Sequence, residues 1–213
     1  MKKALSFIVC MFLLTAVYSQ ADPGIRVGMG VSLNTTAFGD NSDNILLPVG
    51  LANIRVPLQI GDHFRIEPEF GLYSMSEEYD YTINYGNMEQ EYVETSELNI
   101  TRLGGGFYYT MEHKAVENAT LLFGLKSGML FLSRSDEDET KIERTQNIFY
   151  IGGAIAGEYY FSEAFCLGLE VQVNHINYSE PEYEGGEISS EYNSFSRNLF
   201  TTNTVVFAKF FFN

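Results

Sequence analysis

The chain has 213 residues, with 28 acidic side chains against 13 basic ones and a formal net charge of −15. This length suits one all-β domain, and the charge argues against nucleic acid as a partner, because phosphate binding requires clustered Lys and Arg. Beyond the N-terminal leader only one cysteine, Cys166, remains. No internal disulfide can form there, so stability must come from backbone pairing and packing.

The N-terminal segment has the parts of a signal peptide. Two lysines precede an apolar stretch, residues 5–17, that is too short to cross a bilayer as a helix. Small Ser19 precedes the expected cleavage point, and cleavage two residues later is the alternative. We therefore expect a leader at 1–19 and a mature domain at 20–213.

The rest of the chain alternates between segments with a strand pattern and segments with a loop pattern. In residues 25–33 every odd position is apolar and every even position is small or charged, the period of a two-faced strand. The same alternation predicts further strands at 49–59, 64–75, 119–131, 147–160, 165–176 and 200–212.

The fourth predicted strand, 97–109, has the weakest pattern. Leu98 and Ile100 fall on the same face as Arg102, whereas the later apolar residues fall on the opposite face. A β-bulge within 99–102 would restore the alternation. The sequence thus predicts eight strands, with one irregularity in the fourth.

The connections between these strands alternate in length, as expected for an up-and-down meander with one trimmed end. In transmembrane barrels the short turns are periplasmic and the long loops extracellular. The long segments also hold most of the acidic residues and many tyrosines, so we expect them to be the mobile part of the molecule. The predicted short connections are 60–63, 110–118 and 161–164, and the long ones are 38–48, 76–96, 133–146 and 177–198.

The polar face of the strands favours a membrane barrel over a soluble one. It combines many glycines with charges of both signs, which fits a narrow lumen where long side chains cross the axis and pair. A solvated outer face is the alternative. The predicted lumen charge network comprises Arg26, Arg55, Arg65, Glu67, Glu69, Arg102, Lys126, Glu158, Glu170 and Lys209.

Aromatic residues near the strand ends are typical of interfacial girdles. With the leader, the first strand, the segment 58–71 and the C-terminal strand 206–212, they give a chain that resembles the small outer-membrane barrels of the OmpX and OmpA-transmembrane type. The resemblance implies an eight-stranded antiparallel transmembrane β-barrel in the outer membrane of a Gram-negative bacterium. It also implies an assembly signal at Phe210 and Phe212, from which Asn213 departs by following the last aromatic residue.

The sequence contains no phosphate loop, nucleotide fingerprint or Cys/His cluster, and we predict no cofactor and no metal site. One catalytic alternative stays open. His175, Ser179 and Glu180 supply the residue types of a base, a nucleophile and an orienting acid, as in a lipid A deacylase or acyltransferase. The alternative for His175 is a polar residue at the membrane interface.

The leading functional hypothesis is a non-enzymatic outer-membrane protein with a structural or surface-interaction role. Eight strands leave no channel of porin size, so its lumen should be plugged by side chains. The expected partners are membrane lipid, lipopolysaccharide, the barrel-assembly machinery and an unidentified partner of the acidic loops, with the barrel as a monomer. The other hypotheses are the lipid A-modifying enzyme and a soluble lipocalin-like barrel with an apolar ligand.

Overall fold

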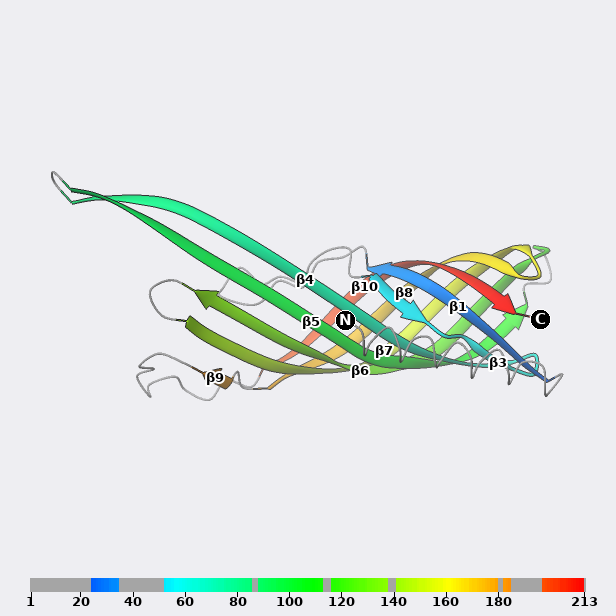
Figure 1. The fold of residues 1–213 in the computed structure, drawn as a ribbon. Coiled ribbons are helices and arrows are strands. Elements are labelled where there is room, and N and C mark those ends of the chain that lie inside the picture. The colour runs from blue at the N-terminus through cyan, green and yellow to red at the C-terminus, as the bar shows by residue number, and fades with distance from the viewer. Residues whose placement is uncertain are drawn as a thin grey trace.

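The computed structural model describes residues 24–34, 52–85, 88–112, 116–137, 141–179, 182–184 and 197–212. These residues form one antiparallel sheet that closes on itself (Figure 1). The strands are β1 (Ile25–Asn34), β2 (Ala52–Arg55), β3 (Leu58–Ile60), β4 (Phe64–Tyr85), β5 (Met88–Glu112), β6 (Ala119–Glu137), β7 (Lys141–Ser162), β8 (Phe165–Tyr178), β9 (Glu182–Glu184) and β10 (Arg197–Phe212).

The wall of the barrel has eight strands because β2 and β3 are two halves of one interrupted strand. Both halves pair with β1 on one side and β4 on the other. The interruption falls at Val56 and Pro57, and proline has no N–H to give to a ladder. Pairing of β10 with β1 then closes the cylinder, from Val27 opposite Phe212 to Asn34 opposite Val205. The predicted eight-stranded antiparallel fold is confirmed.

Three predictions about the strands and loops were wrong. The ladder between β4 and β5 runs without a break from Phe64 opposite Tyr109 to Tyr85 opposite Met88, so no bulge lies at 99–102. The predicted loop 76–96 is therefore mostly paired strand. The predicted loop 133–146 is likewise largely strand, in β6 and β7. Tyr, Thr, Val and Ile within these segments favour extended backbone despite the acidic charge.

Other expectations fall on residues that the structure does not describe. The leader 1–19 and the predicted loop 38–48 lie outside the described residues, and so does most of 177–198. Within that last segment the short strand β9 pairs with β7, placing Glu184 opposite Glu143 and Tyr183 opposite Arg144.

The outer wall of the barrel is apolar. Leu125 is 67% exposed and Leu169 is 50% exposed, and both lie in the middle of their strands. In water such a wall would be a very large exposed apolar patch, whereas in a bilayer it meets lipid. The soluble lipocalin-like alternative, which needs its apolar face inward, is therefore wrong. Among the described residues, no helix is long and apolar enough to cross a membrane.

Aromatic side chains ring the short-turn end of the barrel. On one side Phe64 stacks on Phe107 at 5.9 Å between ring centroids, and on the other Phe165 lies 4.6 Å from Phe210. A second set of aromatic residues, Phe149 on β7 and Phe200 on β10, lies ten residues along the strand from Tyr159 and Phe210. In tilted strands this spacing matches an apolar band about 25 Å tall.

Candidate functional site

The barrel encloses a cluster of charged side chains contributed by seven of the eight wall strands. Burial follows from strand parity, because alternate residues of each strand point into the narrow interior. Nine of these charged residues are buried, namely Arg55, Arg65, Glu67, Glu69, Arg102, Lys126, Glu158, Glu170 and Lys209.

One half of the cluster is built around Glu69 and Glu170. Arg55 on β2 reaches Glu69 at 2.9 Å and Glu170 at 3.0 Å. Lys126 on β6 pairs with both of the same carboxylates, and Arg102 on β5 lies 3.2 Å from Glu69. Each carboxylate therefore contacts at least two cations from different strands, and these ion pairs connect the strands across the lumen.

The other half is built around Glu158 and Glu67. Arg65 lies 2.6 Å from Glu158 and 3.4 Å from Glu67, and Lys209 on β10 pairs with both. Arg55 also approaches Glu67 at 3.6 Å, so the two halves form one connected network. Burying a charge costs several kcal/mol, and the pairing and hydrogen bonds of the network must offset this cost.

Aromatic residues line the network and add hydrogen bonds to it. The Tyr108 hydroxyl donates to Glu170 at 2.8 Å, and the Tyr160 hydroxyl donates to Glu158 at 2.9 Å. The Phe207 ring lies under Lys209, with Nζ 4.2 Å from the centroid. Two glycines make room for the Tyr108 ring, because a side chain at Gly106 or Gly124 would collide with it.

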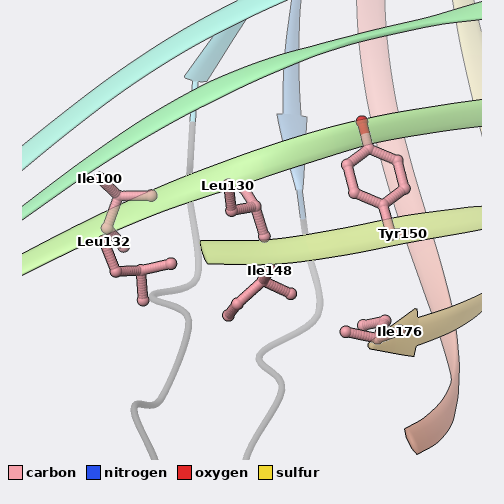
Figure 2. Packing of buried hydrophobic residues seen from close by; sticks show 6 residues of the cluster. All are labelled: Ile100, Leu130, Leu132, Ile148, Tyr150 and Ile176. Carbon is pink, nitrogen blue, oxygen red and sulfur yellow. The ribbon is translucent and has the colours of Figure 1, made fainter. Parts of the chain in front are cut away.

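An apolar layer lies inside the barrel toward the long-hairpin end (Figure 2). It explains why Ile100 shares a face with Arg102, since both point into the lumen, at different depths. Tyr150 joins the two layers, packing in the apolar cluster while its hydroxyl accepts a hydrogen bond from Arg102 Nε at 3.1 Å. The buried cluster consists of Ile100, Leu130, Leu132, Ile148, Tyr150 and Ile176.

Arg26, the tenth predicted member, lies apart from the paired network. It is half-buried near the short-turn end, and its guanidinium lies 4.6 Å from the centroid of the Phe211 ring. Its Nε and Nη2 atoms are buried without a hydrogen-bond partner. Arg65 lies 5.3 Å from the centroid of the same Phe211 ring, but it is bonded to Glu158, Gln59 and Tyr160.

His175 and Ser179, two of the three residues of the catalytic alternative, are not brought together. His175 packs on Phe200 at 4.9 Å between ring centroids, while the Ser179 hydroxyl accepts a hydrogen bond from the backbone N–H of Asn147. The two residues are four positions apart on an extended segment, about 13 Å along the chain. Glu180 lies outside the described residues.

The proposed assembly residues lie on the outer wall at the short-turn end. Phe210 and Phe212 are both exposed there. Phe211 between them points inward and stacks on Tyr160 at 6.1 Å. Within the described ranges, no group of three His, Cys, Asp or Glu side chains is arranged to hold a metal ion.

No protein-family model matches the chain, and no curated protein matches it. Among solved structures, a major outer membrane protein from Thermus thermophilus is similar with a TM-score of 0.55 at 10% identity, covering 88% of this chain and 99% of that chain. The fold is that of a small outer-membrane β-barrel. With the apolar wall, this fold places the chain in a bacterial outer membrane.

Two further barrels match with lower scores. Acinetobacter baumannii CarO2 has a TM-score of 0.38 at 11% identity, covering 88% of this chain and 98% of its own. The Yersinia pestis protein Ail, solved with the heparin analogue sucrose octasulfate, has a TM-score of 0.39 at 9% identity, covering 88% and 96%.

Several residues that matter in the lumen were not singled out from the sequence. Tyr108 has the parity of the polar face of its strand, but its bond to Glu170 depends on a residue 62 positions away. The apolar layer has a signal in hindsight, because Leu130, Leu132, Ile148 and Ile176 interrupt the polar parity near the outer strand ends.

Proposed function

We propose that this outer-membrane barrel is a non-catalytic surface-interaction protein whose lumen is plugged by its own side chains. The observation that carries the surface role is the hairpin of β4 and β5, which runs far past the other strands (Figure 1). A strand crosses a membrane in about 9–11 residues, whereas these two have 22 and 25.

The pairing defines how far this hairpin stands alone. Within the described part of the chain, β4 is paired on its other side with β2 as far as Gly71, and β5 is paired with β6 from Thr95 onward. The 14 residues of β4 beyond Gly71 span about 45 Å. Such a ribbon reaches beyond lipid headgroups, where it can contact another surface.

The composition of the hairpin indicates the chemistry of its partner. Exposed Glu77, Glu78 and Asp80 lie beside exposed Tyr79, and further Tyr and Glu follow in the sequence to residue 94. Tyrosine gives contact area at low entropic cost, and the acidic groups favour a partner with basic groups. The expected partner is therefore a basic protein surface outside the cell.

Shortening the hairpin tests this role. Replacing residues 76–96 by a two-residue turn should abolish binding of cells to a basic protein-coated surface while the barrel still folds. The control is Glu78→Gln with Asp80→Asn, which keeps the length and should weaken binding only in part. Undiminished binding by the shortened protein would refute the surface role.

The plug is proposed from the paired network and the apolar layer above it. Both fill the interior of an eight-stranded barrel, which is only wide enough for side chains. Planar-bilayer recordings of the purified protein should show no porin-like conductance steps. Stable open steps in most insertions would contradict a plugged lumen.

The absence of catalysis is also a proposal, and it rests on the separation of His175 from Ser179. Lipid A from cells with and without the protein should give identical mass spectra. An acyl-chain difference that disappears in a His175→Asn variant would establish the enzyme instead.

We further propose that the exposed Phe210 and Phe212 serve barrel assembly, that residues 1–19 are a cleaved leader, and that the barrel works as a monomer in contact with lipopolysaccharide.

A further inference from the structure

The short-turn end of the barrel contains a vestibule of about 970 Å³. This volume lies near the upper end of the range of about 300–1,000 Å³ for small-molecule sites. Its inner part is formed by Arg26, Arg65, Gln59, Tyr160 and Phe211, which come from five different strands. Since the short turns of outer-membrane barrels are periplasmic, the vestibule opens toward the periplasm.

Most polar groups around the inner part are already satisfied by each other. Gln59 accepts a hydrogen bond from Arg65 Nε at 2.8 Å and donates to Thr110 at 3.3 Å. Arg65 Nη2 donates to the Tyr160 hydroxyl at 3.1 Å. Among the described residues that line the vestibule, Arg26 alone has buried side-chain donors without a partner.

The unpartnered atoms of Arg26 define the ligand chemistry. Nε and Nη2 form the edge of the guanidinium whose two N–H bonds run side by side, the edge that holds a carboxylate through two parallel hydrogen bonds. Phe211 lies against the guanidinium at 4.6 Å. Arg26 is only half-buried and lines the vestibule, whereas Nε and Nη2 themselves are covered, so binding requires the guanidinium to turn this edge toward the vestibule.

The mouth of the vestibule carries the opposite charge. Asp62, Glu112, Glu117 and Glu163 lie in the turns and strand ends there and are exposed. With two arginines against four acids among the lining residues, a multiply charged anion such as a phosphate ester is disfavoured. A ligand with a carboxylate for the inner part and an ammonium group for the mouth matches both regions.

We propose that the vestibule is a binding site for small zwitterions of the amino-acid or short-peptide class, with the ligand carboxylate on Arg26 and its ammonium group among the acids of the mouth. This site faces the periplasm and is independent of the surface role proposed for the hairpin. Binding at Arg26 leaves the ion pairs of the lumen intact, because Arg26 takes part in none of the pairs described above.

The test uses the full barrel in lipid nanodiscs with three probes: glycylglycine, acetate and glycine ethyl ester, which has no free carboxylate. Glycylglycine should bind at millimolar concentration and shift the Arg26 Nε–H resonance, acetate should bind more weakly, and the ester should leave that resonance unmoved. Heat-dependent gel mobility establishes that each variant is folded.

Variants separate the two ends of the site. Arg26→Gln should weaken glycylglycine binding at least tenfold, and Arg26→Lys should also weaken it, because an ammonium lacks the planar pair of donors. Glu117→Gln with Glu163→Gln should reduce glycylglycine binding and leave acetate binding unchanged or stronger. Arg134→Gln, which changes an exposed side chain of β6, is the matched control and should change nothing.

Three results would overturn the proposal. They are no binding of glycylglycine to the folded wild-type barrel, equal binding by Arg26→Gln, and a shift of the Arg26 resonance by the ester. Each can occur whether or not the hairpin binds a surface, so the two proposals fail separately.

Discussion

The two faces of the barrel wall are made by the same strands and follow opposite rules. On β6, Leu125 points to lipid and Lys126, its neighbour in sequence, is buried among carboxylates. On β8, exposed Leu169 precedes buried Glu170 in the same way. In a water-soluble protein the leucines would be inside and the charges outside. The comparison shows that the surroundings of the wall, lipid outside and a narrow polar lumen inside, decide which residues of a strand point outward and which point inward.

The largest effect should come from breaking the lumen network at its centre. Arg55 contacts three carboxylates, Glu67, Glu69 and Glu170, so Arg55→Met leaves buried negative charge without its main partner. Removing one partner of a buried pair costs about 3–5 kcal/mol. Urea unfolding in lipid vesicles measures this loss, and a change below about 1 kcal/mol would mean that the network contributes little.

The matching change on the other face should cost somewhat less. Leu125→Arg or Leu169→Arg places a cation in lipid, which costs about 2–4 kcal/mol near the bilayer centre. Val93→Arg, on the exposed hairpin beyond the barrel, is the control and should be almost neutral. Equal tolerance at Leu125 and Val93 in the same vesicle assay would contradict the assignment of the outer wall.

A smaller effect should come from filling a glycine slot in the lumen. Gly124→Val puts a branched side chain against the Tyr108 ring, and overpacking of this kind costs about 1–3 kcal/mol. Gly153→Val is the control, since a Cβ atom at that position meets no atom within 4 Å. If both variants unfold at the same urea concentration, the slots have no role in fitting the rings.

The smallest effect should come from a solvent-exposed ion pair. Arg134 and Asp136 lie 2.9 Å apart on the part of β6 beyond the lumen network, and exposed pairs contribute about 0–1 kcal/mol. Arg134→Ala should therefore leave the urea midpoint nearly unchanged. A loss as large as that of Arg55→Met would remove the distinction between buried and exposed pairs on which the comparison depends.

The sequence predicted the wall better than the contents of the lumen. Period-two alternation places Lys126 and Glu170 on one face of their strands without knowledge of neighbours, because parity is a local property. Which charges meet depends on register between strands, as in the contact of Lys209 with Glu67. Ile100 shows the limit of the pattern: an apolar residue on the polar face was read as a bulge, although it belongs to the apolar layer of the lumen.

The hairpin of β4 and β5 shows a second limit. The acidic charge of 76–96 led us to expect a mobile loop, but tyrosine and threonine alternate with the charged residues and continue the ladder to Tyr85 and Met88. The net charge of a segment indicates how well it is solvated, whereas extended structure depends on side-chain type and on pairing with a neighbouring strand.

Tryptophan fluorescence tests the two faces most directly, because the chain contains no tryptophan of its own. Leu125→Trp and Tyr108→Trp would each be refolded in vesicles whose lipids carry bromine near the bilayer centre. The brominated lipid should strongly quench tryptophan at 125, which faces lipid, and leave tryptophan at 108, inside the lumen, nearly unquenched. Equal quenching at both positions, or stronger quenching at 108, would contradict a barrel with its charges inside and its apolar wall in the membrane.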